Sequence, residues 1–280
     1  MEKHKYNSEE LIEFLQDAPG AIISLEKIDA SLLKHCPKLR VIAKYGVGLD
    51  NIDQRACQKF NVQFLYTSGV NKTAVAELTV GLMLSLCRNI SRSSLSLKDG
   101  TWKKDGGHDL GGKTIGIIGV GNAGKEVVRL LKPFHCVILA NDIIDQTDYY
   151  EKNKCVKSSR ERILRNSDIV TIHAPLTKKT KFLINRRTLG MMKKTAFLIN
   201  TARGAIVQQL ALKESLKQGR IAGAAVDVYQ QEPPLDYEFL RLPNLICTPH
   251  IGGGSQEAIQ AMGLSAINHL KYFFNQKAPR

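Results

Sequence analysis

The sequence has little that belongs in a membrane or in a low-complexity tract. No apolar run approaches the ~18 to 20 residues that a membrane span requires. The opening residues, MEKHKYNSEELIEF, lack the apolar core of a secretory signal. There is no low-complexity segment and no repeat of solenoid period. These absences lead us to expect a cytoplasmic protein without a membrane partner.

Cysteine is sparse and never clustered. No two of the six cysteines have the close spacing of a zinc site. We therefore expect reduced, mostly buried thiols and no metal ion. The six positions are Cys36, Cys57, Cys87, Cys136, Cys155 and Cys247.

Acidic residues are too few to balance the basic ones. The chain has 26 Asp and Glu against 40 Lys and Arg, so its formal net charge is +14. Such an excess suits nucleic acid, an anionic membrane surface, or an anionic cofactor and substrate. The basic residues are spread along the chain, and no aromatic-rich RNA-binding motif accompanies them. We expect a solvated basic surface, with nucleic-acid binding as an open alternative.

From residue 114 onward the sequence alternates apolar strands with amphipathic helices. The strands are nearly continuous apolar runs, as expected of parallel strands covered on both faces. Between them lie helical stretches such as 123–134 and 207–219. The pattern predicts an α/β domain with a doubly wound parallel sheet. The predicted strands are 114–119, 137–142, 168–175, 195–201, 222–228 and 245–250.

The first 70 residues repeat this alternation on a smaller scale, and 280 residues suit two domains. Residues 71–90 are apolar at helical spacing and predict one long helix. The amphipathic segment 255–274 predicts a helix that packs back on the first domain. We therefore expect a smaller domain made of 1–70 and 252–280, with a larger one inserted at 71–251. Within the smaller domain we expect a helix over 7–18, capped by Asn7 or Ser8, and strands at 20–24, 39–45 and 62–66.

A glycine loop follows the first strand of the larger domain and opens a helix. In Gly119-Val120-Gly121-Asn122-Ala123-Gly124, the three glycines serve a tight turn, close approach of a pyrophosphate, and helix–strand packing. Asp142 ends the next strand, about 20 residues further on, where a carboxylate accepts hydrogen bonds from ribose hydroxyls. No arginine follows to receive a 2′-phosphate. The loop predicts NAD rather than NADP, and the alternative is an aspartate that only caps the strand end.

Arg203, Glu232 and His250 each follow a predicted strand of the larger domain. Because open α/β sheets bind ligands at the carboxyl ends of their strands, we expect the three side chains to converge. A histidine exchanges a proton, a carboxylate raises its pKa, and an arginine binds a substrate carboxylate. Each also has a plainer interpretation: an arginine paired with a structural acid, a solvated glutamate, a histidine without a role. Together they predict oxidation of an alcohol to a carbonyl, or the reverse, coupled to proton transfer.

These residues resemble the D-isomer-specific 2-hydroxyacid dehydrogenase family, and within it the phosphoglycerate dehydrogenase branch. The resemblance runs from about residue 7 to the C-terminus. It implies a Rossmann cofactor domain inserted in a smaller flavodoxin-like substrate domain, which here looks shortened at its N-terminus. It also implies an NAD-dependent enzyme that interconverts a small D-2-hydroxyacid and its 2-oxoacid, with 3-phosphoglycerate among the substrates to consider. The motifs that carry it are GVGLDNID, AVAELTVGLML, GGKTIGIIGVGNAG, HAPLTKKT, LINTARGAIV, AAVDVYQQEPP and TPHIGGGSQEA.

The resemblance implies further contacts with the cofactor. Beside the loop glycines and Asp142, they are Asn122, Ala123, Ala174, Pro175, Thr201, Ala202, Asp227, Gly252 and Gly253. Asn122 and Ala123 would meet the pyrophosphate, and Asp227 would receive the nicotinamide carboxamide. The family also implies a homodimer formed through the cofactor domain, with Trp102 near the interface.

On the substrate side, the resemblance implies that the Val47 and Gly48 amides hold the carboxylate opposite Arg203. The phosphoglycerate branch carries arginines where this chain has Ser24 and Lys44. Lys44 keeps one positive charge without a guanidinium fork, so we include it among the substrate-binding residues. Some relatives with this fold are corepressors, so a non-catalytic NAD(H)-sensing protein is the alternative function.

Overall fold

The computed structural model describes residues 6–276. Its chain divides into two compact units, one made of 1–71 and 255–280 and the other of 72–254. The boundaries expected from the sequence were 70/71 and 251/252. The assignment of a substrate role to the first unit and a cofactor role to the second stays a prediction.

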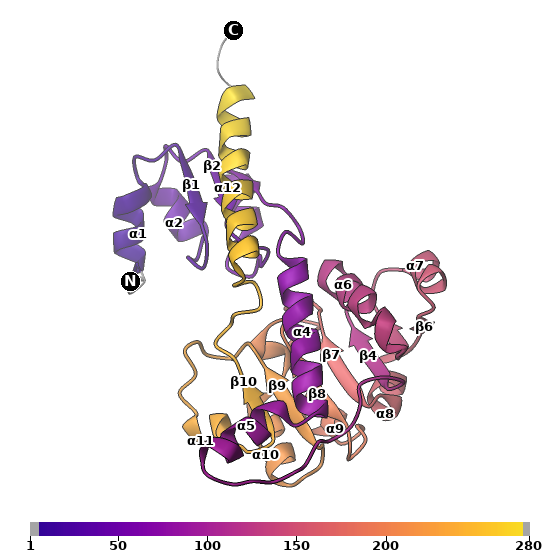
Figure 1. Ribbon diagram of the computed structural model, residues 1–280. Coiled ribbons are helices and arrows are strands. Elements are labelled where there is room, and N and C mark those ends of the chain that lie inside the picture. The colour runs from indigo at the N-terminus through magenta and orange to yellow at the C-terminus, as the bar shows by residue number, and fades with distance from the viewer. Residues whose placement is uncertain (1–5, 277–280) are drawn as a thin grey trace. The chain divides into compact units, whose positions relative to one another are not determined.

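The first unit is built on a three-stranded parallel sheet in the order β1-β2-β3 (Figure 1). Its apolar core includes Leu15, Ile28 and Ile42. Asn7 caps α1 through a capping box with Glu10, which decides between the two caps that the sequence allowed. The elements are β1 (Gly20–Ile23), β2 (Val41–Lys44), β3 (Gln63–Leu65), α1 (Ser8–Leu15), α2 (Ala30–His35) and α3 (Gln54–Lys59).

The last helix, α12 (Gln256–Gln276), packs against β1 and β2 of the same unit. Gly20 permits this close packing, because an added Cβ would lie 2.8 Å from Val41 and 3.1 Å from the Phe274 ring. The Arg40 guanidinium lies 5.5 Å from the centre of that ring. The two ends of the described chain thus pack together in one unit.

The second unit has a seven-stranded parallel sheet in the order β10-β9-β8-β7-β4-β5-β6. Helices cover both of its faces (Figure 1), which confirms the predicted doubly wound fold. The strands are β4 (Thr114–Ile118), β5 (Val137–Asn141), β6 (Val156–Lys157), β7 (Ile169–Ile172), β8 (Phe197–Asn200), β9 (Gly223–Val226) and β10 (Leu245–Cys247). The helices are α4 (Lys72–Cys87), α5 (Ile90–Lys98), α6 (Asn122–Leu131), α7 (Thr147–Lys152), α8 (Arg160–Asn166), α9 (Arg186–Leu189), α10 (Gln209–Lys217) and α11 (Tyr237–Leu240), with 3-10 turns η1 (Lys132–Phe134) and η2 (Gly204–Ile206).

Alternate residues of the strands enter two separate apolar cores. Ile199 and Ala225 face the core formed with α4 and α6. Their neighbours Leu198 and Ala224 face the core formed with α8, α9 and α10. Burial on both faces explains why these strands read as unbroken apolar runs.

The single helix predicted over 71–90 is wrong at its end. Helix α4 stops at Cys87, and α5 begins at Ile90 with a bend of 63°. Asn89 turns the chain with a left-handed φ of 52°, and its side chain is held by Asp105. Within residues 6–276, no single helix is long and apolar enough to cross a membrane, and only α4 and α5 taken together reach that length and composition.

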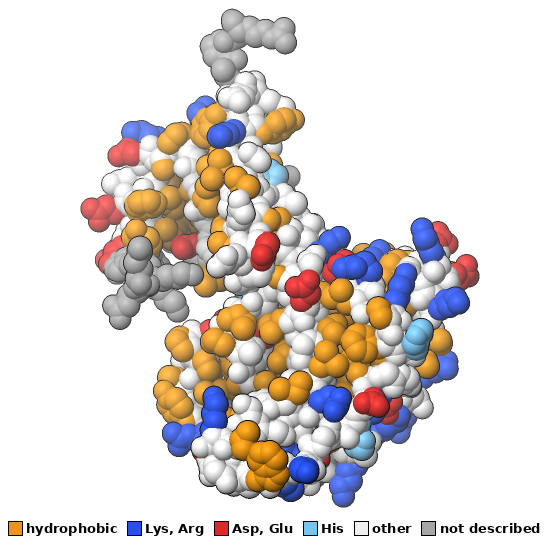
Figure 2. All heavy atoms as spheres, in the orientation of Figure 1, with side chains coloured by type: hydrophobic (Ala, Val, Ile, Leu, Met, Phe, Trp, Pro, Cys, Tyr) orange, Lys and Arg blue, Asp and Glu red, His pale blue; other side chains and the backbone are white. Residues whose placement is uncertain are grey.

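The positive charge is visible on the surface of the second unit. Figure 2 shows Lys and Arg side chains gathered over its α6–α8 side. Arg129, Lys132 and Lys152 are all exposed there. Several of these cations pair with nearby carboxylates, as Arg129 does with Glu126 at 2.7 Å.

Candidate active site

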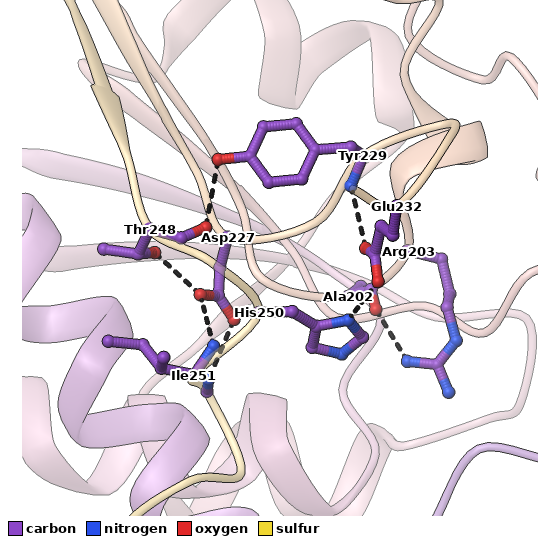
Figure 3. Close-up of polar contacts among 9 residues, drawn as sticks. Ala202, Arg203, Asp227, Tyr229, Glu232, Thr248, His250 and Ile251 are labelled. Atoms are coloured by element: carbon purple, nitrogen blue, oxygen red, sulfur yellow. Dashed lines mark hydrogen bonds and ion pairs between the residues drawn. The ribbon is translucent and has the colours of Figure 1, made fainter. Parts of the chain in front are cut away.

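Arg203, Glu232 and His250 follow the neighbouring strands β8, β9 and β10 of the second unit. Because these strands are parallel, their carboxyl ends meet at one edge of the sheet. Figure 3 shows the three side chains converging there. The convergence expected from the sequence is therefore observed in the structure.

Glu232 and His250 are directly bonded. His250 Nδ1 lies 2.7 Å from Glu232 Oε2 (Figure 3). The other carboxylate oxygen of Glu232 accepts a hydrogen bond from the backbone N–H of Tyr229 at 3.0 Å. An ionised carboxylate only accepts, so Nδ1 carries the proton of a neutral His250 and Nε2 is left as the atom that takes up a proton.

The two pKa values shift apart, as they do in an acid–base pair. The hydrogen bond to Glu232 raises the pKa of His250; burial and the charge of Arg203 oppose this, while the charges of Glu232 and Asp227 add to it. Burial is the largest influence on Glu232 and raises its pKa. The hydrogen bonds from His250 and Tyr229 and the charges of His250 and Arg203 together lower it below its ordinary value. The carboxylate therefore stays ionised while the imidazole becomes a better base.

Arg203 lies in a tight turn that Asn200 holds in place. The Asn200 side chain donates to the Arg203 carbonyl at 2.9 Å and accepts from the Ala202 N–H at 3.1 Å. Arg203 is partly buried, and its Nη1 donates to the Ala202 carbonyl at 2.7 Å. Sequence reasoning missed Asn200, although its place directly before the Thr-Ala-Arg-Gly turn was a signal, since asparagine often hydrogen-bonds nearby backbone.

The residue after Arg203 packs against the loop that carries Glu232. An added Cβ on Gly204 would lie 1.9 Å from the carbonyl carbon of Tyr229. Glycine is therefore required here for close approach of two backbones. Gly204 thus allows the Arg203 loop and the Glu232 loop to lie in direct contact.

Asp227 ties the His250 loop to the end of β9. Its Oδ1 accepts from the Thr248 hydroxyl at 2.7 Å and the Ile251 N–H at 2.8 Å. Its Oδ2 accepts from the Gly252 N–H at 2.8 Å. Asp227 is fully buried, and these donors all come from the chain itself. The carboxamide contact implied by the family stays a prediction.

His250 itself has a left-handed backbone, with φ of 54°. Few residues other than glycine adopt this conformation, and it is often found at functional sites. The His250 N–H donates to the Thr248 carbonyl at 3.0 Å and closes the turn. The strained turn presents the ring to Glu232.

The glycine loop between β4 and α6 has the features of a phosphate cradle. Gly119 has φ of 95°, and an added Cβ would lie 2.5 Å from the backbone N of Ala174. At Gly124 an added Cβ would lie 2.2 Å from the Gly119 carbonyl, so helix and loop pack closely. Gly121 has no atom within 4 Å of an added Cβ, and its side chain position is open. Since α6 begins at Asn122 without a side-chain cap from Gly121, the residues fit a dinucleotide pyrophosphate.

Asp142 follows β5 beside this loop. Its Oδ2 accepts from the Val120 N–H at 2.6 Å, and its Oδ1 from the Ile144 N–H at 2.9 Å. Each oxygen keeps a second lone pair for a ribose hydroxyl. A cavity of about 230 Å³ adjoins Asp142, and the buried Tyr150 lines it. Among the described residues, the Tyr150 hydroxyl has no hydrogen-bond partner.

The remaining predicted cofactor residues lie along the same strand ends. Ala174 and Pro175 follow β7, Ala123 lies in the first turn of α6, and Gly253 follows Gly252. The Thr201 hydroxyl is engaged with the Thr79 hydroxyl of α4 at 3.0 Å. Their contacts with a cofactor stay predictions.

His173, which sequence reasoning did not single out, lies immediately before Ala174. Its Nδ1 is buried and has no partner among residues 6–276, while its Nε2 lies 3.0 Å from the Thr171 hydroxyl. Burial lowers the pKa of His173 to about 4, so the ring is neutral. The His173 backbone lies against the glycine loop, since an added Cβ on Gly119 would lie 2.6 Å from the His173 carbonyl carbon.

The predicted substrate residues Lys44, Val47 and Gly48 lie in the first unit, at and after the end of β2. Lys44 is only 4% exposed, and its ammonium donates to the Ser24 carbonyl and, at 3.1 Å, to Asn51 Oδ1. Asn51 in turn donates to the Glu26 carbonyl at 2.6 Å. Lys44 thus holds the loop that follows it, and its contact with substrate stays a prediction.

Within the described part of the chain, no group of three His, Cys, Asp or Glu side chains has the geometry of a metal site. All six cysteines are free, and burial raises the pKa of each thiol.

Comparisons with known proteins show which family the chain resembles. Residues 80–252 match the family model described as D-isomer specific 2-hydroxyacid dehydrogenase, NAD binding domain. The chain is 40% identical to a glyoxylate reductase of Thermofilum pendens, over 94% of this chain and 80% of that one. It is 38% identical to D-3-phosphoglycerate dehydrogenase of Methanocaldococcus jannaschii, over 94% of this chain but only 51% of that enzyme. The chain thus spans about half the length of this relative.

A solved structure with the same fold is D-lactate dehydrogenase from Aquifex aeolicus, complexed with NAD and lactic acid. Its TM-score is 0.88 at 27% identity, covering 95% of this chain and 85% of that one. The family model and the glyoxylate reductase each match most of this chain. The chain belongs to the D-isomer specific 2-hydroxyacid dehydrogenase family, and its cofactor is NAD.

Proposed function

We propose that this protein reduces a small 2-oxoacid to the D-2-hydroxyacid, and catalyses the reverse reaction, with Arg203, Glu232 and His250 as its catalytic residues. The observation that carries the proposal is the 2.7 Å contact between His250 Nδ1 and Glu232 Oε2, at the same sheet edge as Arg203. A neutral imidazole oriented by a carboxylate is suited to exchange a proton with an alcohol oxygen. NAD supplies the hydride chemistry when it is bound.

His250 Nε2 acts as the general acid in reduction and as the general base in oxidation. Glu232 fixes the tautomer and stabilises the protonated ring. The Arg203 guanidinium binds the substrate carboxylate through two parallel hydrogen bonds and draws electron density from the neighbouring carbonyl. These roles need a substrate with a carboxylate beside its reacting carbon, which is what defines a 2-oxoacid.

The proposed contacts with the cofactor begin at the glycine loop. Gly119, Gly121, Gly124, Asn122 and Ala123 hold the pyrophosphate at the N-terminus of α6. Asp142 accepts from the adenosine ribose hydroxyls. The residues proposed to line the adenine and nicotinamide ends are Ala174, Pro175, Thr201, Ala202, Asp227, Gly252 and Gly253.

Val47 and Gly48 of the first unit supply backbone amides to the substrate carboxylate. This chain is similar both to a glyoxylate reductase and to a phosphoglycerate dehydrogenase, so the 2-oxoacids of both kinds of enzyme are candidate substrates. The buried position of Lys44 favours substrates without a phosphate, since its ammonium already bonds Ser24 and Asn51.

The protein acts as a homodimer formed through its second unit. Support comes from apolar side chains that α5 and the next segment leave exposed, namely Ile90, Leu95, Leu97 and Trp102, the last 77% exposed. Sedimentation velocity tests this: Trp102→Asp is expected to increase the monomer fraction, and a wild-type monomer at micromolar concentration would contradict it.

A steady-state assay of NADH oxidation tests the function. The panel contains glyoxylate, pyruvate, hydroxypyruvate and 3-phosphohydroxypyruvate, with acetate and acetone as controls that lack one of the two required groups. We expect turnover with at least one 2-oxoacid and none with the controls. A folded protein that binds NADH but turns over no 2-oxoacid would reject the proposal and favour NAD-dependent capture of a partner.

A further inference from the structure

Tyr229 contacts all three loops of the proposed site, although it has no assigned role. It lies two residues after Asp227, is 8% exposed, and belongs to the core shared with α10. Figure 3 shows its ring above the site, with its hydroxyl directed at Thr248 and its backbone N at Glu232. A residue with contacts to all three loops can fix their positions relative to one another.

The hydroxyl contact reaches the turn that carries His250. The Tyr229 hydroxyl donates to the Thr248 carbonyl at 3.0 Å. The same carbonyl accepts the His250 N–H at 3.0 Å, in the turn where His250 has its left-handed φ. The Thr248 carbonyl oxygen therefore accepts two hydrogen bonds, one from the Tyr229 hydroxyl and one from the His250 backbone.

The backbone contacts reach the other two loops. The Tyr229 N–H donates to Glu232 Oε1 at 3.0 Å, which leaves Oε2 for His250. Gly204, next to Arg203, lies against the Tyr229 carbonyl group. Removing the tyrosine hydroxyl takes away its contacts with the Thr248 carbonyl and the neighbouring Cys247 thiol. The contacts with Glu232 and Gly204 stay, because the Tyr229 backbone makes them.

We propose that the Tyr229 hydroxyl is a positioning group that holds the His250 turn so that the imidazole stays bonded to Glu232. This inference depends on the proposed function for its catalytic meaning. The charged groups that act on the ring are Glu232, Asp227 and Arg203. Burial raises the pKa of Tyr229, so its hydroxyl remains a donor across the working pH range.

The variant that tests this is Tyr229→Phe, which keeps the ring and removes the hydroxyl. We expect kcat to fall about 3- to 10-fold, the ordinary effect of one neutral hydrogen bond, with the KM for NADH unchanged within about 2-fold. The matched control is Tyr237→Phe in α11, since Tyr237 is 61% exposed. That control is expected to match the wild type in both parameters.

A measurement independent of turnover decides the matter. The imidazole pKa of His250 is read by NMR in the NAD-free protein, and its signal is assigned by its loss in His250→Asn. Because the bond to Glu232 raises this pKa, loosening it in Tyr229→Phe is expected to lower the value by roughly 0.5. In a Glu232→Gln background the same substitution is expected to change it no further.

An unchanged His250 pKa in Tyr229→Phe would overturn the inference. This holds even if the variant has a lower melting temperature or a lower kcat, because the loss of a purely structural tyrosine would have the same two effects. An equal shift in the Glu232→Gln background would also overturn it. If the wild type turned over no 2-oxoacid, the proposed function would fail while the NMR result still decided the positioning role.

Discussion

His250 Nδ1 lies 2.7 Å from Glu232 Oε2, although the two residues follow different strands, β9 and β10. Neighbouring parallel strands bring their loops to one edge, so a histidine and a carboxylate from separate loops form one acid–base unit. The pKa of His250 is raised and that of Glu232 lowered.

The reduction should lose activity as the pH rises through the pKa of His250. In the proposed reduction protonated His250 gives the proton. Because Glu232 raises the pKa of His250, activity is expected below that raised pKa and should extend further toward alkaline pH. Glu232→Gln is expected to move the midpoint of kcat/KM down, toward the ordinary value of about 6.5. The measurement is a pH–rate profile of both proteins. A midpoint that stays in place or rises would contradict it.

Replacement of His250 should remove turnover but spare NADH binding. We compare His250→Asn with His250→Ala, because asparagine tolerates the left-handed backbone that His250 adopts. In both we expect kcat to fall about 10²- to 10⁴-fold, the usual contribution of a general acid–base group. Fluorescence titration with NADH checks binding, and exposed His108→Asn is the control. More than a tenth of wild-type kcat in either variant would exclude the assigned role.

Arg203 should govern the use of substrate. Arg203→Gln is expected to lower kcat/KM for the 2-oxoacid about 10- to 100-fold, the effect of losing charged hydrogen bonds, with NADH affinity unchanged. Arg203→Lys keeps the positive charge but loses the guanidinium fork, so its kcat/KM should lie between those of the wild type and Arg203→Gln. Exposed Arg220→Gln is the matched control. If Arg203→Gln weakened NADH binding and left the oxoacid KM alone, the assignment would be wrong.

Asp142 should set the preference for NADH over NADPH. Asp142→Ser removes the carboxylate that we propose binds the ribose hydroxyls and repels a 2′-phosphate. We expect kcat/KM for NADH to fall about 10-fold or more, and the NADPH to NADH ratio to rise. The control is Asp145→Ser nearby, whose carboxylate is exposed and bonded to Lys157. An unchanged ratio in Asp142→Ser would contradict the role.

Gly204 should tolerate no side chain. In Gly204→Ala, the new Cβ would lie 1.9 Å from the Tyr229 carbonyl carbon, so one of the two loops has to move. We expect a clear drop in melting temperature, with a loss of stability above about 2 kcal/mol, as for other overpacked sites. Gly106→Ala is the control, because no atom lies within 4 Å of its Cβ. Equal melting temperatures for the two variants would show that the loops adapt freely.

Much of the site could be predicted from the sequence because its chemistry lies at strand ends. Apolar strands show where a parallel sheet ends, and the polar residues just beyond, Arg203, Glu232 and His250, then converge by the geometry of the sheet. Gly119 and Gly124 could also be predicted from the sequence, since a Cβ at either position would collide with nearby backbone. The direct Glu232–His250 bond followed from the same reasoning.

The remaining features depend on side-chain packing that no local pattern encodes. The break between α4 and α5 depends on Asn89 and its distant partner Asp105. The three donors to Asp227 come from residues about twenty positions further on, and Lys44 is occupied by Ser24. The sequence did not single out Tyr229, because its hydroxyl partner Thr248 is brought to it only by the pairing of β9 with β10.

The most direct test of the central claim follows the hydride into the product. The protein is incubated with NADH deuterated at both positions of nicotinamide C4 and with pyruvate or hydroxypyruvate. The product is then analysed by chiral chromatography and mass spectrometry. We expect the D-2-hydroxyacid with a single deuterium on C2. An L-hydroxyacid, a product without deuterium, or no product from any 2-oxoacid would contradict it.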